Sequence, residues 1–493
     1  MLTRLKVSGF KNLNNVDVSF GPFTCIAGAN GVGKSNLLDA ITLLGALADR
    51  TLLDAALSVR DQGAKTGDVR GLFHHSGNEY ADEMSFEAEM IIAPSGYDDL
   101  GQSAEATSTL VRYLVRLRYR RDENARAFGP LELIEEDLRH IAKGEAIRHL
   151  LFSNSEEWRD AVVVNKRRAP RFISTENEGV DRRIKLHQDG GSSGRPQRFI
   201  AENLPRTVLS ATNSAESPTA TLVKKEMQSW RLLQLEPSSL REPDSFTSPT
   251  NLTTKGAHLP ATLYRLAHSP KGGLRDSARV YSEVSNRVAQ LIDDVRSVDV
   301  MRDEQRQLLT LQVIGRDGTA HPARSLSDGT LRFLALAVLA LDSESGGVIC
   351  LEEPENGIHP ERIPAMIQLL QALATDSNES DPKLLATPLR QVIINTHSPS
   401  VVLQVPNDSL VLAAPLSIKA NEHFIRSVQL RSLRGTWREK LEGSRPIEKG
   451  QLLAYLNPVA LGGDEPEDEP RPRRVIDSID FLQYKIPFAE FSS

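Results

Sequence analysis

The sequence predicts an α/β protein in which helices flank a mixed sheet, and three apolar runs carry this prediction. Residues 23–27 form a short apolar run that suits a buried strand, and residues 34–48 then place apolar side chains at helical spacing. Residues 347–351 and 391–398 are further apolar runs that suit strands covered on both faces. The order of strand, glycine-rich loop and helix puts the loop at a helix N-terminus, where negative charge is favoured.

The loop after the first of these strands fits the phosphate-binding pattern of two glycines with four residues between them, followed by Lys-Ser. It reads Gly28-Ala29-Asn30-Gly31-Val32-Gly33-Lys34-Ser35. The glycines let the backbone curve round phosphates, so that successive N–H groups point at the anion. Lys34 is expected to reach the β- and γ-phosphates, and the hydroxyl of Ser35 to hold Mg²⁺. The loop therefore predicts a nucleoside triphosphate site.

Composition and cysteine usage narrow the class of protein. The 493 residues are 40% hydrophobic and 25% charged, which leaves room for two or three domains around a sizeable core. Cys25 and Cys350 each lie in a predicted buried strand, so we expect free thiols in a reducing cytosol and no zinc site. We expect no signal peptide and no membrane span. The net charge of -6 gives no general electrostatic argument for nucleic acid.

Four regions are expected along the chain. Residues 1–129 would form a first lobe with an antiparallel sheet, and residues 300–430 a second lobe. Between them, residues 130–299 would be a mainly helical insertion, with helices over residues 131–151, 216–232, 261–267 and 277–295. Residues 431–493 would be a tail that contains a helix and, at 462–474, a Pro-rich linker.

A row of arginines in the first lobe has two interpretations. Residues 111–120 alternate, with an apolar face opposite a face that carries Arg112, Arg116, Arg118 and Arg120. A basic sheet face beside aromatic residues suits contact with DNA. Alternatively, glutamates of residues 84–90, on the neighbouring predicted strand, are natural cross-strand partners of these arginines. The sequence favours the second interpretation.

Three further features complete the predicted chemistry. The strand at 347–351 delivers Glu352 and Glu353, of which one can enter the Mg²⁺ shell and the other can polarise the attacking water. Ser327 and Gly329 precede an apolar helix, where Ser327 is by default an N-cap but also lies where another phosphate could bind. The predicted strand at 391–398 delivers His397 at its end, and this place favours a functional role.

Taken together, residues 28–35, 326–332, 351–360 and 393–399 resemble the ABC-type ATPase heads of the SMC, RecF and OLD families. The resemblance is closest to the smaller bacterial ATPases related to OLD, and residues 5–12 look like the first strand of such heads. It implies a P-loop NTPase that forms a head-to-tail ATP sandwich, as a homodimer or higher homo-oligomer, and that reopens on hydrolysis.

The same resemblance assigns roles to individual residues. Glu353 would be the catalytic base, His397 the switch histidine near the γ-phosphate, and Ser35 and Glu352 the Mg²⁺ ligands. Contacts to the nucleotide are expected from Lys11, Asn12, Gly28, Asn30, Gly31, Gly33, Lys34, Ser35 and Asn36, and across the dimer from Ser327 and Gly329.

The chain also departs from the pattern of many ABC heads. Glu352 stands where many have aspartate, and Asp328 and Thr330 stand where transporters have glycine and glutamine. Gln62 is the only candidate for the Q-loop glutamine near its expected place. Residues 415–493 are too short for the nuclease domain of OLD-type proteins, so a separate effector such as a nuclease is expected.

Two functions remain open at this point. The first is an ATP-hydrolysing switch coupled to DNA or to a partner effector, in DNA repair or phage defence. The second is a scaffold that holds ATP with little turnover and restrains a nuclease or toxin. Intact Glu353 and His397 favour turnover, because a scaffold needs no base for an attacking water. A transporter subunit is less well supported, since the interval 48–325 is far longer than in the transporter ATPases.

Overall fold

The computed structural model describes most of the chain up to Leu456. The described residues are 1–59, 69–77, 79–121, 129–166, 171–178, 181–189, 194–268, 277–292, 294–342, 345–381, 387–420, 423–441 and 443–456. Gln62 and the linker predicted at 462–474 lie outside them. No helix within the described residues is long and apolar enough to cross a membrane.

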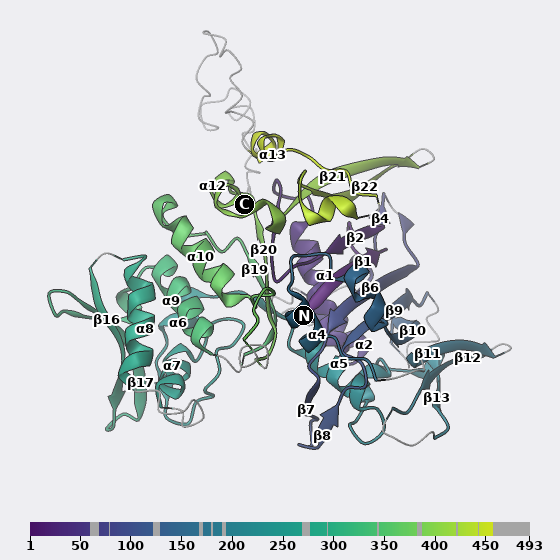
Figure 1. Ribbon diagram of the computed structural model, residues 1–493, viewed down its shortest axis with the longest axis horizontal. Coiled ribbons are helices and arrows are strands. Elements are labelled where there is room, and N and C mark those ends of the chain that lie inside the picture. Colours follow the sequence, from purple (N-terminus) through teal and green to yellow (C-terminus); the bar gives the residue numbers. More distant parts are fainter. Residues whose placement is uncertain are drawn as a thin grey trace, which may run out of the picture. The chain divides into compact units, whose positions relative to one another are not determined.

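A six-stranded sheet forms the centre of the structure (Figure 1). Its strand order is β14-β19-β20-β3-β21-β22, and every neighbouring pair except β21 and β22 is parallel. The strands span Arg231–Leu233 (β14), Gly347–Glu352 (β19), Arg390–Thr396 (β20), Phe23–Ala27 (β3), Leu410–Ala420 (β21) and His423–Ser432 (β22). The three apolar runs of the sequence form strands, as predicted, and the structure pairs them side by side as parallel neighbours.

The middle of this sheet is covered on both faces, which explains why β3, β19 and β20 are buried without alternation. On one face, Ile26, Cys350 and Ile393 join a core shared with α1 (Lys34–Leu47) and with a second, larger sheet. On the other face, Cys25 and Ile349 join a core shared with α9 (Asp328–Leu341) and α10 (Ile363–Leu373). Both cysteines are buried free thiols, as expected from the sequence.

The larger sheet has eight antiparallel strands in the order β13-β12-β11-β10-β9-β6-β1-β2. They span Gln197–Ile200, Asp181–Leu186, Arg171–Glu178, Leu131–His140, Leu110–Tyr119, Glu83–Ile91, Leu2–Ser8 and Val16–Ser19, in that order. Two small hairpins lie beside it: β4 (His75–Ser76) with β5 (Glu79–Tyr80), and β7 (Ser95–Tyr97) with β8 (Ser103–Glu105). The helices of this part are α2 (Leu52–Leu57), α3 (Ala146–His149), α4 (Glu156–Val162) and α5 (Pro218–Gln228).

The arginines of β9 are ion-paired along the larger sheet. Arg112 contacts Glu89 at 2.6 Å, and Arg118 contacts Glu83 at 2.6 Å, both across to β6. On the other side, Arg116 contacts Glu135 of β10 at 3.3 Å. The cross-strand interpretation of this row is therefore confirmed.

The expected helix over residues 131–151 is wrong, because residues Leu131–His140 form strand β10. The register of β10 against β9 shifts between Leu133 and Glu135, so Ile134 is an extra residue in a bulge. The bulge breaks the period-two pattern and leaves apolar residues at spacings that imitate a helix. Residues 171–200 add three more strands, so the first half of the predicted helical insertion is mainly sheet, and its helices α3 and α4 are short.

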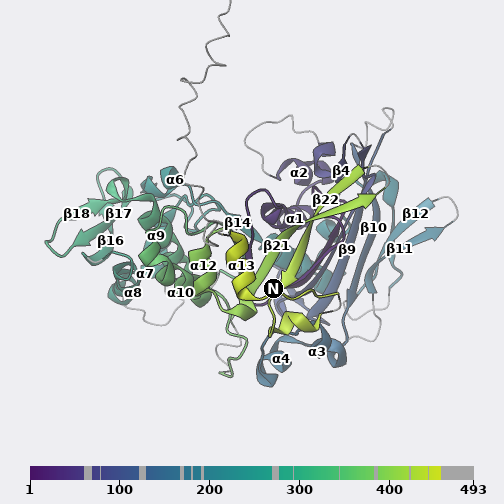
Figure 2. The same ribbon diagram turned by 90° about the horizontal axis from the view of Figure 1, so that it is seen from above.

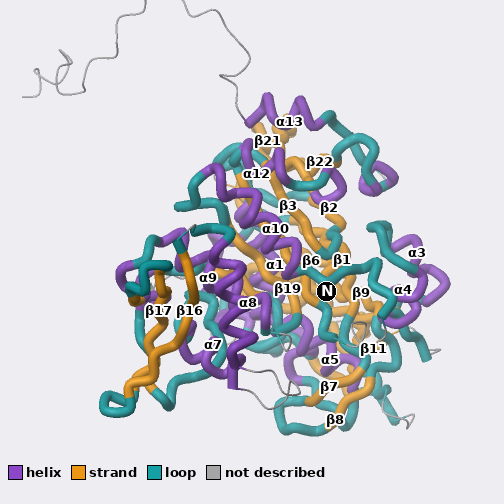
Figure 3. Tube along the Cα trace, turned by 60° about the vertical axis from the view of Figure 1, so that its left-hand side comes forward, coloured by secondary structure: helices purple, strands orange, loops and turns teal. Residues whose placement is uncertain are grey.

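The second half of that segment is helical, as expected, and leads into a small separate sheet. α6 (Pro237–Arg241), α7 (Leu259–His268) and α8 (Ser277–Ala289) pack with α9. The small sheet consists of β15 (Asp244–Ser245), β16 (Val295–Asp303), β17 (Leu308–Gly315) and β18 (Ala320–Pro322). Figures 2 and 3 show that α8 and α9 lie between this sheet and the strands of the centre. Two short helices, α12 (Pro399–Gln404) and α13 (Lys449–Leu456), follow later in the chain.

A buried carboxylate fastens the larger sheet to the segment that supports α1. The bulge turns Glu136 into the core, where it accepts hydrogen bonds from the backbone N–H groups of Val208 (2.7 Å) and Leu209 (2.8 Å). The adjacent Thr207 donates its hydroxyl to the carbonyl of Leu47 at the end of α1 (2.9 Å). Burial raises the pKa of Glu136 to about 7, although the hydrogen bonds it accepts oppose this change.

This raised pKa makes a prediction about stability. A carboxyl whose pKa rises on folding favours the folded state at low pH and loses that contribution as the pH rises toward about 7. The unfolding free energy of wild type relative to Glu136→Gln should therefore fall between pH 5 and pH 8, by roughly 2 to 3 kcal/mol for a change of this size. Urea unfolding at both pH values measures it. Glu135→Gln, on the opposite face of the same strand, is the control; an equal pH effect in both variants would contradict the assignment.

Candidate functional site

The parallel pairing of the central sheet brings the carboxyl ends of four strands to one edge. There β3 leads into the glycine-rich loop, β19 ends at Glu352, β20 leads to His397, and β14 leads to Gln234. Because parallel strands end on the same side of a sheet, residues that are hundreds of positions apart become neighbours. This edge is the candidate site.

Lys34 lies at the centre of the glycine-rich loop and is 6% exposed. Its Nζ donates hydrogen bonds to the loop carbonyls of Gly28 (2.7 Å) and Ala29 (2.9 Å). Burial lowers the pKa of Lys34, and the carboxylates that follow β19 oppose part of that change. The ammonium is thus held where the loop backbone converges, at the N-terminus of α1.

The loop is shaped by the segment between β1 and β2. Gly33 has a φ of 109°, and a Cβ there would lie 2.3 Å from Nδ2 of Asn12, so only glycine fits beside that side chain. Asn12 donates to the carbonyl of Val32 (2.9 Å) and accepts from the amide of Asn36 on α1 (2.8 Å). Lys11 forms an ion pair with the buried Asp39 of α1 at 2.7 Å. The structure therefore places Lys11, Asn12 and Asn36 directly beside the loop.

Glu353 adopts a left-handed backbone conformation, with a φ of 44° that is unfavourable for a side chain other than glycine. Asn395 stabilises it, because both its backbone carbonyl (3.1 Å) and its side-chain Oδ1 (3.0 Å) accept hydrogen bonds from the N–H of Glu353. The Glu353 carboxylate then lies 2.7 Å from Nδ1 of His397. The predicted base and the predicted switch histidine are thus in direct contact.

The surroundings of Glu353 favour its ionised form. Burial acts to raise the pKa of this carboxyl, but hydrogen bonds from Asn356 and His397, with the charge of Lys34, outweigh it and hold the pKa below its ordinary value. An ionised carboxylate is what a residue needs to orient a water molecule and receive its proton. The next acid, Glu355, is buried and bonded to Thr396, and burial raises its pKa.

A cavity of about 530 Å³ opens at this edge. Its walls include the hydroxyl residue Ser35, the carboxylates of Glu352 and Glu353, and Asn395, whose Nδ2 lies 3.5 Å from Oγ of Ser35. A hydroxyl and a carboxylate are oxygen ligands of the kind that Mg²⁺ prefers, with nucleotide oxygens and water completing its shell. Among the described residues no group of three His, Cys, Asp or Glu side chains could hold a metal ion alone. The donors present fit a Mg²⁺ ion that is bound together with a nucleotide.

The sequence analysis missed four residues of this site: Gln234, Arg332, Asn356 and Asn395. All four line the cavity. Gln234 follows β14, a three-residue strand parallel to β19. So short a strand has no periodic signal, and its pairing with β19 is visible only in the fold. Asn395, in contrast, has a signal in the sequence, because it is a polar residue near the end of an apolar strand.

Ser327 and Gly329 do not line this cavity. Ser327 is the N-cap of α9, where its side chain accepts a hydrogen bond from the N–H of Thr330 at 3.2 Å, as its default role predicted. Arg241 of α6 holds the same turn by donating to the carbonyl of Leu326 (3.0 Å) and to Asp328 (2.6 Å). The side chains of Ser327 and Asp328 remain exposed at the surface.

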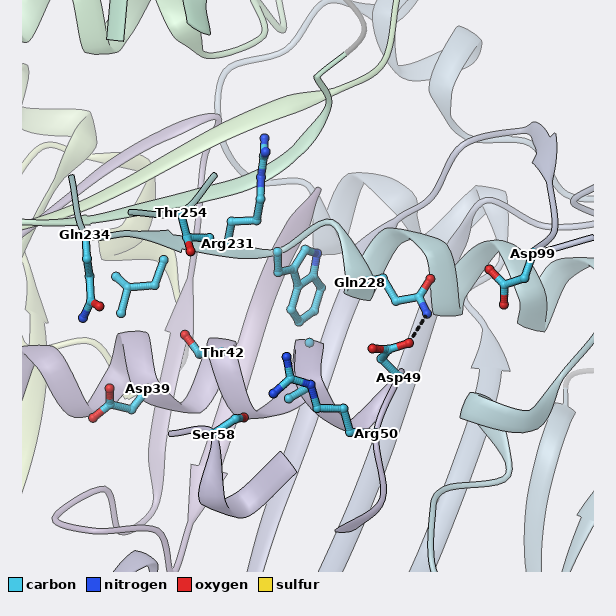
Figure 4. Close-up of a pocket in the computed structure, with 14 residues that line it drawn as sticks. Asp39, Thr42, Asp49, Arg50, Ser58, Asp99, Gln228, Arg231, Gln234 and Thr254 are labelled. Atoms are coloured by element: carbon cyan, nitrogen blue, oxygen red, sulfur yellow. Dashed lines mark hydrogen bonds between the residues drawn. The ribbon is translucent and has the colours of Figure 1, made fainter. Parts of the chain in front are cut away.

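A second cavity, of about 580 Å³, lies along the outer side of α1. Figure 4 shows Gln234 and Asp99 at opposite ends of the row of labelled side chains, with Asp49 bonded to Gln228 between them. Asp39 pairs with Lys11, and Asp99 with two lysines. The acidic side chains of this second cavity are therefore already paired. Gln234 lines both cavities.

Comparison with known proteins shows the family of the chain. A family described as "AAA domain, putative AbiEii toxin, Type IV TA system" matches residues 23–403. The match extends from β3, which leads into the glycine-rich loop, to α12, which follows His397.

Curated relatives match shorter stretches. The DNA replication and repair protein RecF of Clavibacter sepedonicus is 32% identical over 115 residues, which are 23% of this chain and 27% of RecF. The DNA double-strand break repair Rad50 ATPase of Halobacterium salinarum is 42% identical over 81 residues, which are 16% of this chain and 9% of Rad50. The OLD nuclease of Thermus scotoductus is 48% identical over 44 residues, which are 9% of this chain and 8% of the nuclease. The chain thus spans at most 27% of the length of these three relatives.

Among solved structures, an SMC head bound to the C-terminal winged-helix domain of ScpA covers 88% of this chain and 98% of its own, with 13% identity and a TM-score of 0.42. That score carries no argument about function. The family match, in contrast, covers more than half of the chain. The protein belongs to this AAA-domain family, and it is an ABC-type ATPase head of the SMC, RecF and OLD group.

Proposed function

We propose that the protein binds ATP with Mg²⁺ and hydrolyses it to ADP and phosphate. One observation carries this proposal: Glu353 is held by Asn395 and His397 in the same cavity as Ser35 and Glu352. A carboxylate in this position can accept a proton from the water that attacks the γ-phosphate. Mg²⁺, when bound, neutralises the charge of the phosphates.

In this mechanism each residue has a separate task. The loop N–H groups and Lys34 bind the phosphates, and Ser35 and Glu352 supply oxygen ligands to the metal. Glu353 orients the water and takes its proton as the bond to the γ-phosphorus forms and the bond to the β-phosphate oxygen breaks. His397 positions the Glu353 carboxylate and lies beside the expected γ-phosphate.

We further propose that ATP is enclosed by two protomers and that turnover is coupled to DNA or to a separate effector such as a nuclease, in DNA repair or phage defence. The exposed turn at Ser327 supports the dimer, because it lies outside the cavity of its own chain. The names of the relatives RecF and Rad50 refer to DNA repair, which supports DNA as a trigger. The ion pairs of β9 make its arginines a weak candidate for the DNA contact.

Lys34→Ala is expected to abolish nucleotide binding. The substitution removes the cation that the loop holds in place, and a hydrogen bond to a charged group contributes about 1.5 to 3 kcal/mol, so the Kd for ATP should rise at least about 10-fold. Titration with a fluorescent ATP analogue measures this. Lys6→Ala, at an exposed lysine of β1, is the control. Tight ATP binding by Lys34→Ala would exclude the loop as the site.

Glu353→Gln should retain ATP but hydrolyse it about 100-fold to 10,000-fold more slowly, because the amide cannot accept the proton of the attacking water. Steady-state phosphate release by wild type and variant, with and without double-stranded DNA, measures the effect. Stimulation by DNA would favour a DNA-responsive ATPase. Turnover indifferent to DNA would favour a protein trigger, and wild-type turnover no faster than that of the variant would favour the scaffold.

Ser327→Arg should prevent closure of the dimer, because a bulky cation would occupy the exposed turn that is expected to meet the partner's nucleotide. Light scattering with ATP should show dimers for Glu353→Gln and monomers for the Glu353→Gln, Ser327→Arg double variant. The control is the double variant Glu353→Gln, Arg306→Gln, because Arg306 lies on an exposed turn between β16 and β17. It should form dimers. If the double variant dimerises as well as Glu353→Gln alone, Ser327 acts only as a helix cap.

A further inference from the structure

We propose that Arg332 is a positioning residue that connects the turn at Ser327 to the catalytic base Glu353 and to Gln234. This inference rests on the proposed hydrolysis of ATP. Arg332 lies on α9, little more than one turn after the N-cap Ser327, and its side chain lines the nucleotide cavity. It is therefore on the same rigid element as the turn that meets the partner protomer.

The guanidinium group of Arg332 bonds to two separate loops. Its Nη1 donates to the carbonyl of Asn356 at 2.9 Å, and its Nε donates to the carbonyl of Leu235 at 3.2 Å. Asn356 belongs to the loop that follows β19, and Leu235 belongs to the segment that follows β14. One side chain on α9 thus fixes two of the strand exits that form the site.

The first of these contacts leads directly to the base. Nδ2 of Asn356 donates to Oε2 of Glu353 at 3.0 Å, and the backbone N–H of Asn356 donates to the carbonyl of Glu353 at 3.0 Å. The other carboxylate oxygen of Glu353 contacts His397. The orientation of the Glu353 carboxylate is thus set from one side by His397 and from the other by Asn356, which Arg332 holds.

A close backbone contact makes this connection stiff. A Cβ at Gly329 would lie 2.2 Å from the carbonyl oxygen of Gly357, so the first turn of α9 packs directly against the loop that contains Asn356. Gly357 itself has a φ of 82°. A displacement of the N-terminus of α9 by a partner's nucleotide would therefore also move the loop that contains Asn356 and adjoins Glu353, because the two segments are in direct contact.

The second contact extends the connection to Gln234. Leu235 follows Gln234 directly, and the N–H of Gln234 is held by the carbonyl of Thr254 at 2.8 Å. Arg332 therefore ties α9 to the glutamine that lines both cavities. A change in the position of Gln234 at the second cavity can therefore alter the orientation of Glu353 through Arg332 and Asn356.

A guanidinium suits this task better than an ammonium. Its rigid planar group presents donors in two directions at once, whereas lysine has a single charged centre on a flexible stem. Arg332→Lys keeps the positive charge but cannot hold both carbonyls in the same geometry. This difference separates positioning from a simple electrostatic effect.

Steady-state kinetics on the full chain test the inference with Arg332→Lys, Arg332→Gln and Asn356→Ala. If Arg332 positions the base through Asn356, all three variants should lower kcat about 10-fold or more, while the Kd for ATP changes less than about 3-fold. The double variant Arg332→Lys, Asn356→Ala should lose little more than either single variant, since both act on one carboxylate. Asn356 is exposed, so its replacement keeps the test valid if the Arg332 variants fail to fold.

The control is Arg306→Gln, at an arginine whose side chain is 79% exposed, which should turn over ATP at the wild-type rate. Three results would overturn the inference: an unchanged kcat in the Arg332 and Asn356 variants, equal losses in kcat and ATP affinity, or full additivity in the double variant. These results are distinct from failure of the proposed function, in which wild type itself would turn over no faster than Glu353→Gln.

Discussion

The parallel pairing of β14, β19, β20 and β3 is the constraint on which the rest of the structure depends. All four strands are short, and β19, β20 and β3 are buried between two cores. Their pairing places the exits of all four strands on one edge. Lys34, Glu353, His397 and Gln234 meet only because of this edge, and none of them is near all the others in sequence.

Buried polar contacts then fix what the pairing has brought together. Asn395 holds Glu353 in a strained backbone conformation, and Asn12 occupies the space that Gly33 leaves free. Strain of this kind persists only where the surroundings determine it strongly, and it concentrates at functional sites. The same logic applies to Glu136, whose buried carboxylate is tolerated because three donors satisfy it.

Ion pairs link the arginines of β9 to glutamates of the neighbouring strands in the larger sheet. Its arginines and glutamates alternate across neighbouring strands, so that the outward face is a network of ion pairs. The pairs of Arg116 and Arg118 are partly exposed and contribute little stability each, whereas Glu89, the partner of Arg112, is buried. Together the pairs neutralise a face that the sequence alone would present as basic. The arginines of β9 are therefore engaged with glutamates of the same sheet, and they do not form a free basic patch.

The sequence by itself determined the phosphate-binding loop, the acidic pair after β19, the histidine after β20 and the cap at Ser327. Each of these is a local pattern, in which a strand or helix end adjoins the residues that carry the chemistry. It did not determine β10, because the bulge at Ile134 disrupts the alternation on which a strand prediction relies. Nor did it reveal Gln234 or Arg332, because a three-residue strand has no period and a guanidinium has no preferred partner until the chain has folded. Contacts between distant segments depend on strand order and side-chain packing, and only the tertiary structure decides those.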